Sequence, residues 1–599
     1  MKTTRLLLIL LLIFSLFVFG CDEDNDDDDD DDATPTDDDT DDEAYDQPWD
    51  EDLARPIVRI NQPDDGEFIV GGAVTVRGTV TGEPADELLI NGKPVNIVSG
   101  GQFQTTVNFS NGQTVLPIYA SASTTEGAIG ADRVVAIRGE MSEPEQIVED
   151  ALLLMLGDEA FPAIDTILAQ ALVDLDLLPL FADLNPIIDA LGVTVDVTAA
   201  SIGGANVEGE FTDGGMHFYA ELTEVTLGTS TTFLGIPSDS SVTLASIGLD
   251  IDADVELRDG AVTVTIAGID VSHGDVSYEG ILGFLGAPIT SLLLNVVEGV
   301  VELAVRLAVP GLLENVLTDL AFQTVLIGFD IEAGLTTLDI GPGAAVLGLD
   351  LNVFLTDPIA HDWPRGSLAT PGLPPDPLTD RPAEAASFGL GVSLGDDLLN
   401  RIFYGVAESD LLSFSLDDTG TFDDALEVSL TAGTLAVLLP AFADVNPQIP
   451  AMVRLYPAVP PLTLPSDDGA LTLVVPDMRV EFYLLPPEED PWLALTMAAY
   501  LEFGIDMNAT GDGALLFAFP IANATVQTLD NPIGEAAPVI DPIVDWLTQT
   551  VQPLLNLIFE NLPIRIPEVF GVTVDPLWIG TAGENLDYWT SYIGLTVAE

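Results

Sequence analysis

Hydrophobic and polar residues alternate in short runs along much of this chain, and three long apolar stretches interrupt the alternation. Between residues 55 and 140, short alternating runs are separated by turn pairs such as Asp65-Gly66 and Asn91-Gly92. Runs of this length and spacing predict an all-β, immunoglobulin-like sandwich. Its expected strands are 57–60, 73–77, 87–90, 103–107, 115–119 and 134–137. Modules of this kind mostly act as spacers, and a binding role is the alternative.

The three apolar stretches predict long helices. Ser142-Glu-Pro-Glu145 offers an N-cap with early carboxylates, and apolar residues follow it at spacings of three and four. The other two helices are expected from Ile281 to Leu320 and from Pro538 to Leu562. Strands are expected between them at 193–197, 215–225, 242–257, 261–271, 388–394, 411–416, 426–431, 452–455, 471–475, 478–485, 493–503 and 514–522, and at the end near 572 and 592–597.

The second apolar stretch has hydrophobic residues on every face of the predicted helix. Leu292, Leu293, Val296, Val297 and Val300 are part of this set. A helix that is apolar almost all round is buried or faces a hydrophobic ligand. The alternative is that an accompanying sheet fills the space with its own side chains.

The N-terminus has the pattern of an exported protein. Lys2 and Arg5 precede an apolar run from Leu6 to Phe19, which ends in Gly20 and Cys21. A signal ending in Gly-Cys resembles the bacterial lipoprotein signal, in which the cysteine is acylated and becomes the first residue. Val18 and Phe19 depart from that pattern, and the alternative is a plain secretory signal with an incidental thiol. Cys21 is the only cysteine, so the mature chain forms no disulfide within itself.

Acidic residues dominate the charge. The chain carries 98 acidic and 16 basic residues, for a formal charge of −82, with 47% hydrophobic residues. This balance excludes duplex nucleic acid as a partner, disfavours anionic membrane surfaces, and resembles proteins from saline habitats. Residues 22–52 are the most acidic segment and predict a solvated tether. Loose calcium association is the alternative, although the alternating ligands and turn glycine of a calcium loop are missing.

Two segments of the second half resemble one mammalian family. Gly391 to Tyr404, with Ser409 to Leu416, is similar to the opening of the C-terminal barrel in bactericidal/permeability-increasing protein, lipopolysaccharide-binding protein and cholesteryl ester transfer protein. Asn556 to Pro567 is similar to the family's exit from its long helix, without its glycine. The resemblance covers 387–599 by motif and 142–355 by architecture only.

This resemblance implies tubular lipid-binding (TULIP) domains, in which a twisted antiparallel sheet wraps a long helix around an apolar tube for acyl chains. The family's disulfide and its cationic tip have no counterpart here, so we do not expect lipopolysaccharide to bind by charge.

Catalytic patterns are sparse. The chain has no Gly-x-Ser-x-Gly elbow, no His-Glu-x-x-His motif and no phosphate loop. His217, His273 and His361 are well separated and are expected to be structural. We expect neither an enzyme, a cofactor nor a metal site.

The expected fold is therefore multidomain: a signal peptide (1–20), an acidic tether (21–54), an Ig-like sandwich (55–140), an α+β TULIP-like domain (141–355), a proline-rich connector (356–385) and a second TULIP-like domain (386–599). We expect a lipid-anchored protein of the bacterial cell envelope, at the outer membrane or cell surface in preference to the inner membrane, that binds or transfers phospholipid or fatty acyl chains. The alternative is a structural or adhesive lipoprotein with dry barrel cores. The candidate lining residues, all placed on the long helices, are Leu152, Met155, Leu292, Val296, Val300, Val551, Leu555 and Phe559.

Overall fold

The structure is a computed structural model. It describes residues 55–182, 184–190, 192–284, 287–322, 330–354, 361, 363–370, 372–376, 381–416, 430–436, 439–465, 470–487, 489–509, 514–532, 540–560, 564–565, 572–583 and 585–597. The chain divides into two units, Met1–Asp46 and Gln47–Glu599, and every described residue belongs to the second. Cys21, the acidic tether and residues 426–429 of the predicted strand 426–431 lie outside the described residues, and Thr431 forms an isolated bridge with Pro450.

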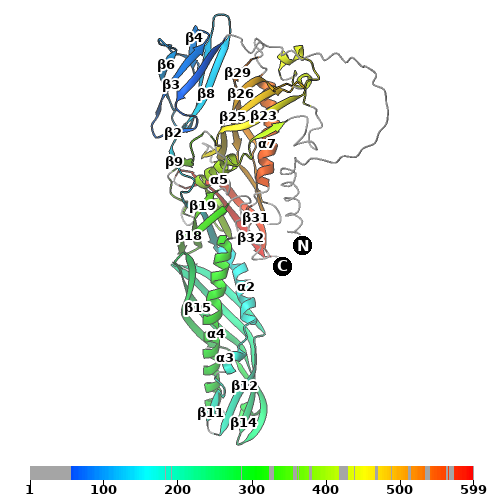
Figure 1. Ribbon diagram of the computed structural model, residues 1–599. Coiled ribbons are helices and arrows are strands. Elements are labelled where there is room, and N and C mark those ends of the chain that lie inside the picture. Colours follow the sequence, from blue (N-terminus) through cyan, green and yellow to red (C-terminus); the bar gives the residue numbers. More distant parts are fainter. Residues whose placement is uncertain are drawn as a thin grey trace, which may run out of the picture. The chain divides into compact units, whose positions relative to one another are not determined.

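The first part is a β-sandwich, and all six predicted strands form in it. One sheet has the order β1-β3-β6 and the other the order β2-β8-β7-β4-β5 (Figure 1). Side chains such as Val76 and Ile118, both fully buried, fill the space between the sheets. The strands are β1 (Pro56–Gln62), β2 (Glu67–Ile69), β3 (Ala73–Gly82), β4 (Glu87–Ile90), β5 (Lys93–Pro94), β6 (Gln102–Asn108), β7 (Val115–Ser123) and β8 (Ile129–Arg138).

The second part is a long antiparallel sheet beside a long helix. The sheet has the order β11-β12-β14-β15-β16, with β13 paired to β14 and β17 paired to β15. Its strands are β11 (Ile188–Ala190), β12 (Val193–Ser201), β13 (Gly204–Thr212), β14 (Gly215–Phe233), β15 (Ile236–Arg258), β16 (Ala261–His273) and β17 (Val276–Glu279). Its helices are η1 (Asp158–Ala160), α2 (Phe161–Val173), α3 (Leu178–Ala182), η2 (Gly280–Phe284) and α4 (Ala287–Phe322), so the second predicted helix is confirmed.

The first predicted helix is wrong over its N-terminal part. Residues Val148–Gly157 form strand β10, so Leu152 and Met155 are strand residues. Ser142 lies in strand β9 (Glu140–Ser142), which pairs with β20 (Ser367–Ala369), and caps no helix. A short apolar run that is buried on both faces of a sheet has no alternation, so periodicity cannot separate it from a helix.

Strand β10 lies inside a sheet that joins the two halves of the chain. The order is β18-β19-β10-β21-β32-β31, with β10 antiparallel to both β19 and β21. Three of its strands come from each half. The remaining strands are β18 (Asp330–Gly341), β19 (Ala344–Phe354), β21 (Leu390–Gly395), β31 (Val572–Ala582) and β32 (Tyr588–Val597).

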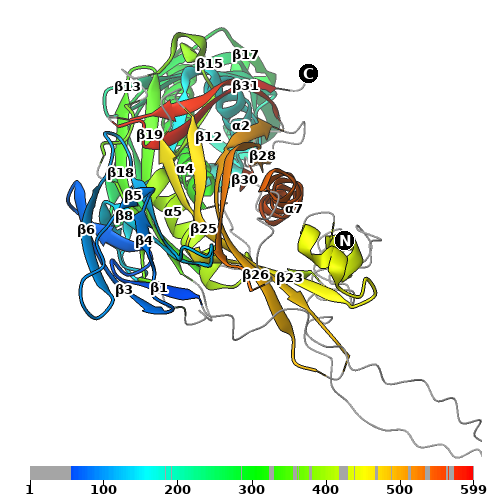
Figure 2. The same cartoon turned by 90° about the horizontal axis from the view of Figure 1, so that it is seen from above.

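The last part is again a sheet beside a long helix. Its main sheet has the order β22-β23-β25-β26-β29, with β24 paired to β25, and a small sheet has the order β27-β28-β30. In Figure 2 the view runs along α7, with β25, β26 and β28 curving past it. The strands are β22 (Phe414–Leu416), β23 (Ala451–Val459), β24 (Leu462–Pro465), β25 (Leu471–Leu484), β26 (Trp492–Gly504), β27 (Asp506–Ala509), β28 (Ala514–Ala518), β29 (Ile521–Asp530) and β30 (Ile564–Arg565).

The helices of this part are η3 (Ala383–Ala385), α5 (Asp396–Glu408), α6 (Ala432–Leu435), η4 (Pro440–Asp444) and α7 (Ile540–Glu560). Helix α7 confirms the third predicted helix. The predicted strands 471–475 and 478–485 form one continuous strand, β25, which changes register with β26 between Val475 and Met478.

Candidate functional site

Helix α4 buries one face and exposes the other. The buried side chains recur at spacings of three and four, and each is at most 4% exposed: Leu293, Val297, Val300, Val301, Ala304, Val305, Val309, Leu313 and Leu317. On the opposite face Leu292, Leu303 and Leu307 are 51%, 46% and 67% exposed. Helix α4 is therefore apolar on every face but buried on one face, which the sheet covers.

The sheet presents an apolar inner face to that stripe and an acidic outer face to solvent. Phe218, Leu222 and Leu249 are almost fully buried. Asp250 and Asp252 alternate with the apolar residues of β15 and point outward. The two-residue period of a strand thus puts carboxylates outside and hydrocarbon inside.

One end of this interior is polar. Thr229, Thr231 and Ser240 are at most 8% exposed and lie near the hairpin that joins β14 to β15. The Thr229 hydroxyl donates to the Ser240 carbonyl oxygen at 3.2 Å, whereas the Ser240 Oγ has no hydrogen-bond partner among the described residues. A buried hydroxyl without a partner is costly, so this end suits a polar group of a ligand.

Helix α4 is also tied to β16 by three polar side chains. Glu298 contacts the His273 ring at 2.7 Å, and Arg306 donates to the Ile266 carbonyl oxygen at 3.1 Å. The Glu314 carboxylate accepts from the Val264 amide at 2.9 Å. Strand β16 ends the sheet order, with no neighbouring strand among the described residues. Arg306 and Glu314 therefore provide hydrogen-bond partners for backbone groups of this sheet edge.

Helix α7 repeats the arrangement in the last part of the chain. Ile543, Leu547, Val551 and Leu555 follow each other at four-residue steps and are at most 2% exposed. Trp546 lies 6.3 Å from the Phe482 ring of β25, measured between ring centroids. The Asn556 side chain accepts a hydrogen bond from the Phe519 amide at 3.0 Å, which fixes the helix against the start of β29.

The structure separates the predicted lining residues into three groups. Val300 faces the first interior, with Val296 half-buried beside it and Leu292 turned outward. Val551 and Leu555 face the second interior, and the Phe559 side chain lies outside the described residues. Leu152 and Met155 are elsewhere, in the joining sheet, where Met155 packs in a cluster with Phe388 and Tyr592.

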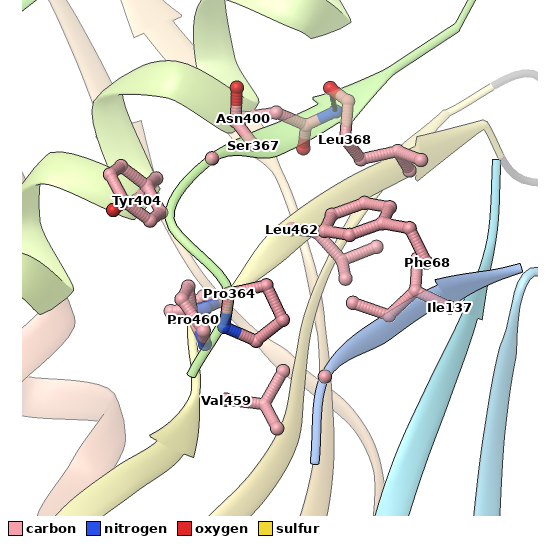
Figure 3. A pocket seen from close by; sticks show the side chains of 13 residues that line it. Phe68, Ile137, Pro364, Ser367, Leu368, Asn400, Tyr404, Val459, Pro460 and Leu462 are labelled. Atoms are coloured by element: carbon pink, nitrogen blue, oxygen red, sulfur yellow. Dashed lines mark hydrogen bonds between the residues drawn. The ribbon is translucent and has the colours of Figure 1, made fainter. Parts of the chain in front are cut away.

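A small cavity lies where the sandwich, the connector, α5 and β23–β24 meet (Figure 3). Phe68 and Ile137 line it from the sandwich, and Leu368, Tyr404 and Leu462 are among the residues that line it from the other elements. Its volume is ≈ 20 Å³. That is space for about one water molecule, so an acyl chain does not fit there.

A buried charge network joins the sandwich to β25. Asp477 is fully buried and contacts Arg479 at 2.8 Å and Arg133 at 4.0 Å. Arg133 Nη2 donates to the Pro476 carbonyl oxygen at 2.7 Å. Burial, followed by repulsion from Asp477, raises the pKa of Asp65 in the same cluster. The sandwich is therefore fixed to the last sheet, which a mere spacer does not require.

A second carboxylate cluster lies at the start of α5. Asp396 is 2% exposed, and its carboxylate accepts from the Thr370 hydroxyl at 2.7 Å. Burial, followed by repulsion from Asp397, raises the pKa of Asp396 to about 8. Among the described residues, no group of three or more His, Cys, Asp or Glu side chains is arranged to hold a metal ion.

The three histidines do not form a common site. His217 contacts Asp252 at 2.9 Å, and this hydrogen bond is the main cause that raises the pKa of the ring. His273 contacts Glu298, and His361 stacks on Trp363 with ring centroids 3.8 Å apart. Each ring thus lies beside a different structural partner.

Comparisons with known proteins give one family match and several distant structural likenesses. Residues 56–134 match the family described as glucodextranase, domain B. No curated protein matches the chain. None of the helices that the structure describes is both long enough and apolar enough to span a bilayer.

Among solved structures, the lipopolysaccharide binding protein is similar at a TM-score of 0.42 and 12% identity, over 76% of this chain and 100% of that chain. P47 of Clostridium botulinum E1 is similar at a TM-score of 0.23 and 8% identity, over 75% of this chain and 99% of that one. P47 from Clostridium botulinum A2 is similar at a TM-score of 0.22 and 8% identity, over 75% and 97%. Such values are too low to support an argument about function.

Proposed function

We propose that this chain binds lipids with acyl chains in the two interiors between sheet and helix, and that it does so without catalysis. The proposal rests on one arrangement that occurs twice in the chain, once with α4 and once with α7. In each case a curved antiparallel sheet with an apolar inner face lies beside a helix with one buried apolar face. Transfer of apolar surface from water contributes about 25 cal/mol per Å², so such interiors favour acyl chains over polar ligands.

The close packing of α4 defines how a ligand would enter. Val297, Val301 and Val305 are at most 1% exposed, so an acyl chain has to separate the helix from the sheet. Polar contacts from Glu298, Arg306 and Glu314 join the helix to the edge strand β16, and Pro310 lies within the helix between Arg306 and Glu314. Proline removes a backbone hydrogen bond, so the helix can bend there more easily.

The buried hydroxyls at the hairpin end support an orientation for the ligand. Thr229, Thr231 and Ser240 offer hydrogen bonds but no charge, so they suit an ester or hydroxyl group near the lipid headgroup. Headgroup selectivity should then be weak, and anionic lipids should be disfavoured by the acidic outer surface.

The test is displacement of a fluorescent fatty acid from the full-length protein, with extraction and mass spectrometry of lipid that copurifies without detergent. Val301→Trp fills the first interior, and Leu307→Trp is the matched control because Leu307 is 67% exposed on the same helix. We expect Val301→Trp to lower the bound probe per chain, at a folding cost of about 1–3 kcal/mol, and Leu307→Trp to leave it unchanged. Leu547→Trp, with Gln549→Trp as control, tests the second interior.

Two outcomes would contradict the proposal. If the wild-type protein carries no lipid and binds no probe, the cores are dry and the structural alternative holds. If Val301→Trp and Leu307→Trp reduce binding equally while both remain folded by thermal unfolding, the probe binds the outer surface.

We also propose that Cys21 is acylated and anchors the chain at the bacterial cell envelope, outward of the inner membrane. The signal pattern and the solvated acidic segment after it support this placement. Two acyl chains suffice for stable anchoring, so acylated Cys21 would hold the protein at the membrane. Cys21→Ser removes the acylation site and should therefore move the protein to soluble fractions or leave its signal uncleaved. Unchanged membrane fractionation and an unchanged mass of the mature chain would refute the anchor.

A further inference from the structure

The outer face of the β1-β3-β6 sheet carries basic and uncharged side chains. Its outward positions carry no acidic side chain, although the whole chain has 98 acidic and 16 basic residues. The outward residues are Ile57, Arg59, Asn61, Ala73, Thr75, Arg77, Thr79, Thr81, Gln102, Gln104, Thr106 and Asn108. Residues 55–139 contain six basic and eight acidic residues, so this part is nearly neutral.

Arg59, Arg77 and Lys93 have no carboxylate partner in the described part of the chain, whereas Arg55, just before β1, pairs with Asp530. Arg77 donates to the Gln104 and Gln62 side-chain oxygens, both at 3.2 Å, and forms no ion pair there. By contrast, Arg258, Arg306 and Arg479 each contact a carboxylate. Arg138, Arg381 and Arg454 also form no ion pair in the described part of the chain, but each lies over an aromatic ring.

The strand pairing brings the positive groups together. Arg59 lies opposite Thr79, and Arg77 is two residues from Thr79 on the same strand. Diagonal neighbours of this kind are roughly 7–8 Å apart in an antiparallel pair. Lys93, the only lysine beyond Lys2, is exposed in β5 directly before Pro94, which lines the same groove.

An open groove of ≈ 680 Å³ adjoins this face, and Arg77 is the basic residue that lines it. Side-chain amides and hydroxyls line it, and Pro94, Val95 and Val98 give it an apolar wall. The lining residues are Asn61, Arg77, Gly78, Thr79, Pro94, Val95, Asn96, Val98, Gln102, Phe103, Gln104 and Thr105. This volume is in the range of small-ligand sites, but the lining is far more polar than that of an apolar pocket.

We propose that this groove, with Arg59, Arg77 and Lys93, binds a carboxylated glycan. Asn and Gln amides both donate and accept hydrogen bonds, which matches sugar hydroxyls that also do both. Phe103 is 3% exposed, so the groove has no aromatic platform on which an uncharged sugar could stack. Carboxylates therefore supply the main attraction, through charge-assisted hydrogen bonds from the arginines.

The experiment is calorimetric titration of the full-length protein with an oligouronate at 0.15 M NaCl, where the Debye length of about 8 Å screens the distant acidic surface. A neutral oligosaccharide of the same length and an oligoglutamate of the same charge are the comparison ligands. We expect the oligouronate alone to bind. The Arg59→Gln/Arg77→Gln double variant should weaken it at least about tenfold, since both charge-assisted contacts are lost. Arg258→Gln, which removes an exposed arginine on another sheet, should leave binding unchanged.

Four results would overturn the proposal. No binding of the oligouronate, or binding that the double variant retains, would remove the groove as its site. Equal binding of the neutral oligosaccharide would refute the role of charge. Equal binding of oligoglutamate would show a surface for acidic peptides instead of glycans. Thermal unfolding of the double variant, expected to match the wild type because both side chains are exposed, confirms that a loss of binding is local.

Discussion

Replacing Asp477 with leucine should strongly destabilise the part of the chain where the sandwich meets the last sheet. Asp477 is fully buried and neutralises two arginines, Arg479 at 2.8 Å and Arg133 at 4.0 Å. The side chain of Arg133 is 1% exposed and cannot reach water without a rearrangement, whereas that of Arg479 is 14% exposed and reaches water only in part. Leucine is similar in size but leaves these two positive charges with Asp65 and Asp132 as the remaining nearby carboxylates.

The expected magnitude follows from this burial. Removing one partner of a buried ion pair costs about 3–5 kcal/mol, because the other charge is left desolvated. Three features place Asp477 in that class: its own zero exposure, the burial of Arg133, and an apolar surround that includes Val135, Val459 and Val474. The exposed pair between Arg258 and Glu256, with side chains 62% and 58% exposed, belongs to the class worth about 0–1 kcal/mol.

The assay is urea unfolding followed by the fluorescence of tryptophans, with calorimetry to separate the transitions. Asp477→Leu should lower the unfolding free energy of the transition that contains the sandwich and β25 by about 3–5 kcal/mol, and Arg258→Gln should change it by less than about 1 kcal/mol. An Asp477→Leu variant within 1 kcal/mol of the wild type would refute the reasoning. It would mean that water reaches the network or that the sandwich is not held by it.

Two further predictions concern pH and salt. The pKa of Asp396 in the folded chain is raised to about 8 from 3.8, so the folded state keeps a proton that the unfolded state releases near pH 4. Its contribution to the unfolding free energy therefore falls as pH rises from about 4 to about 8. The Asp396→Asn variant should accordingly gain stability relative to the wild type between pH 5 and pH 8. If the difference in unfolding free energy between variant and wild type, measured in urea, is the same at pH 5 and at pH 8, the prediction is wrong. The formal charge of −82 should make the melting temperature rise between 0.01 M and 1 M NaCl, as the Debye length falls from about 30 Å to about 3 Å. A flat or falling melting temperature would show that self-repulsion is not limiting.

The sequence by itself determined the elements whose signals are local. The strands of the sandwich follow from alternation and from turn pairs such as Asn91-Gly92, where both residues adopt positive φ values. Helices α4 and α7 follow from apolar runs too long for strands. The outward positions of β1, β3 and β6 could also have been predicted from the two-residue period of a strand. Reading every second residue of these strands from the sequence shows that the outward residues are uncharged or basic.

Tertiary structure decided the features that depend on two distant segments. The sequence of strand β10 predicts a helix because both of its faces are buried and its residues do not alternate. Its neighbours are far away in sequence, since Leu152 pairs with Leu349 of β19 and with Leu394 of β21. The residues that face the two interiors could be predicted in part, since the sequence analysis named Val300, Val551 and Leu555. It could not predict that Leu292 faces outward, because leucines occur on both faces of α4 and only the position of the sheet decides which face is buried. The pairing of Arg133 with Asp477 had no sequence signal at all. In a chain with 98 acidic residues, only burial shows which carboxylate an arginine has as its partner.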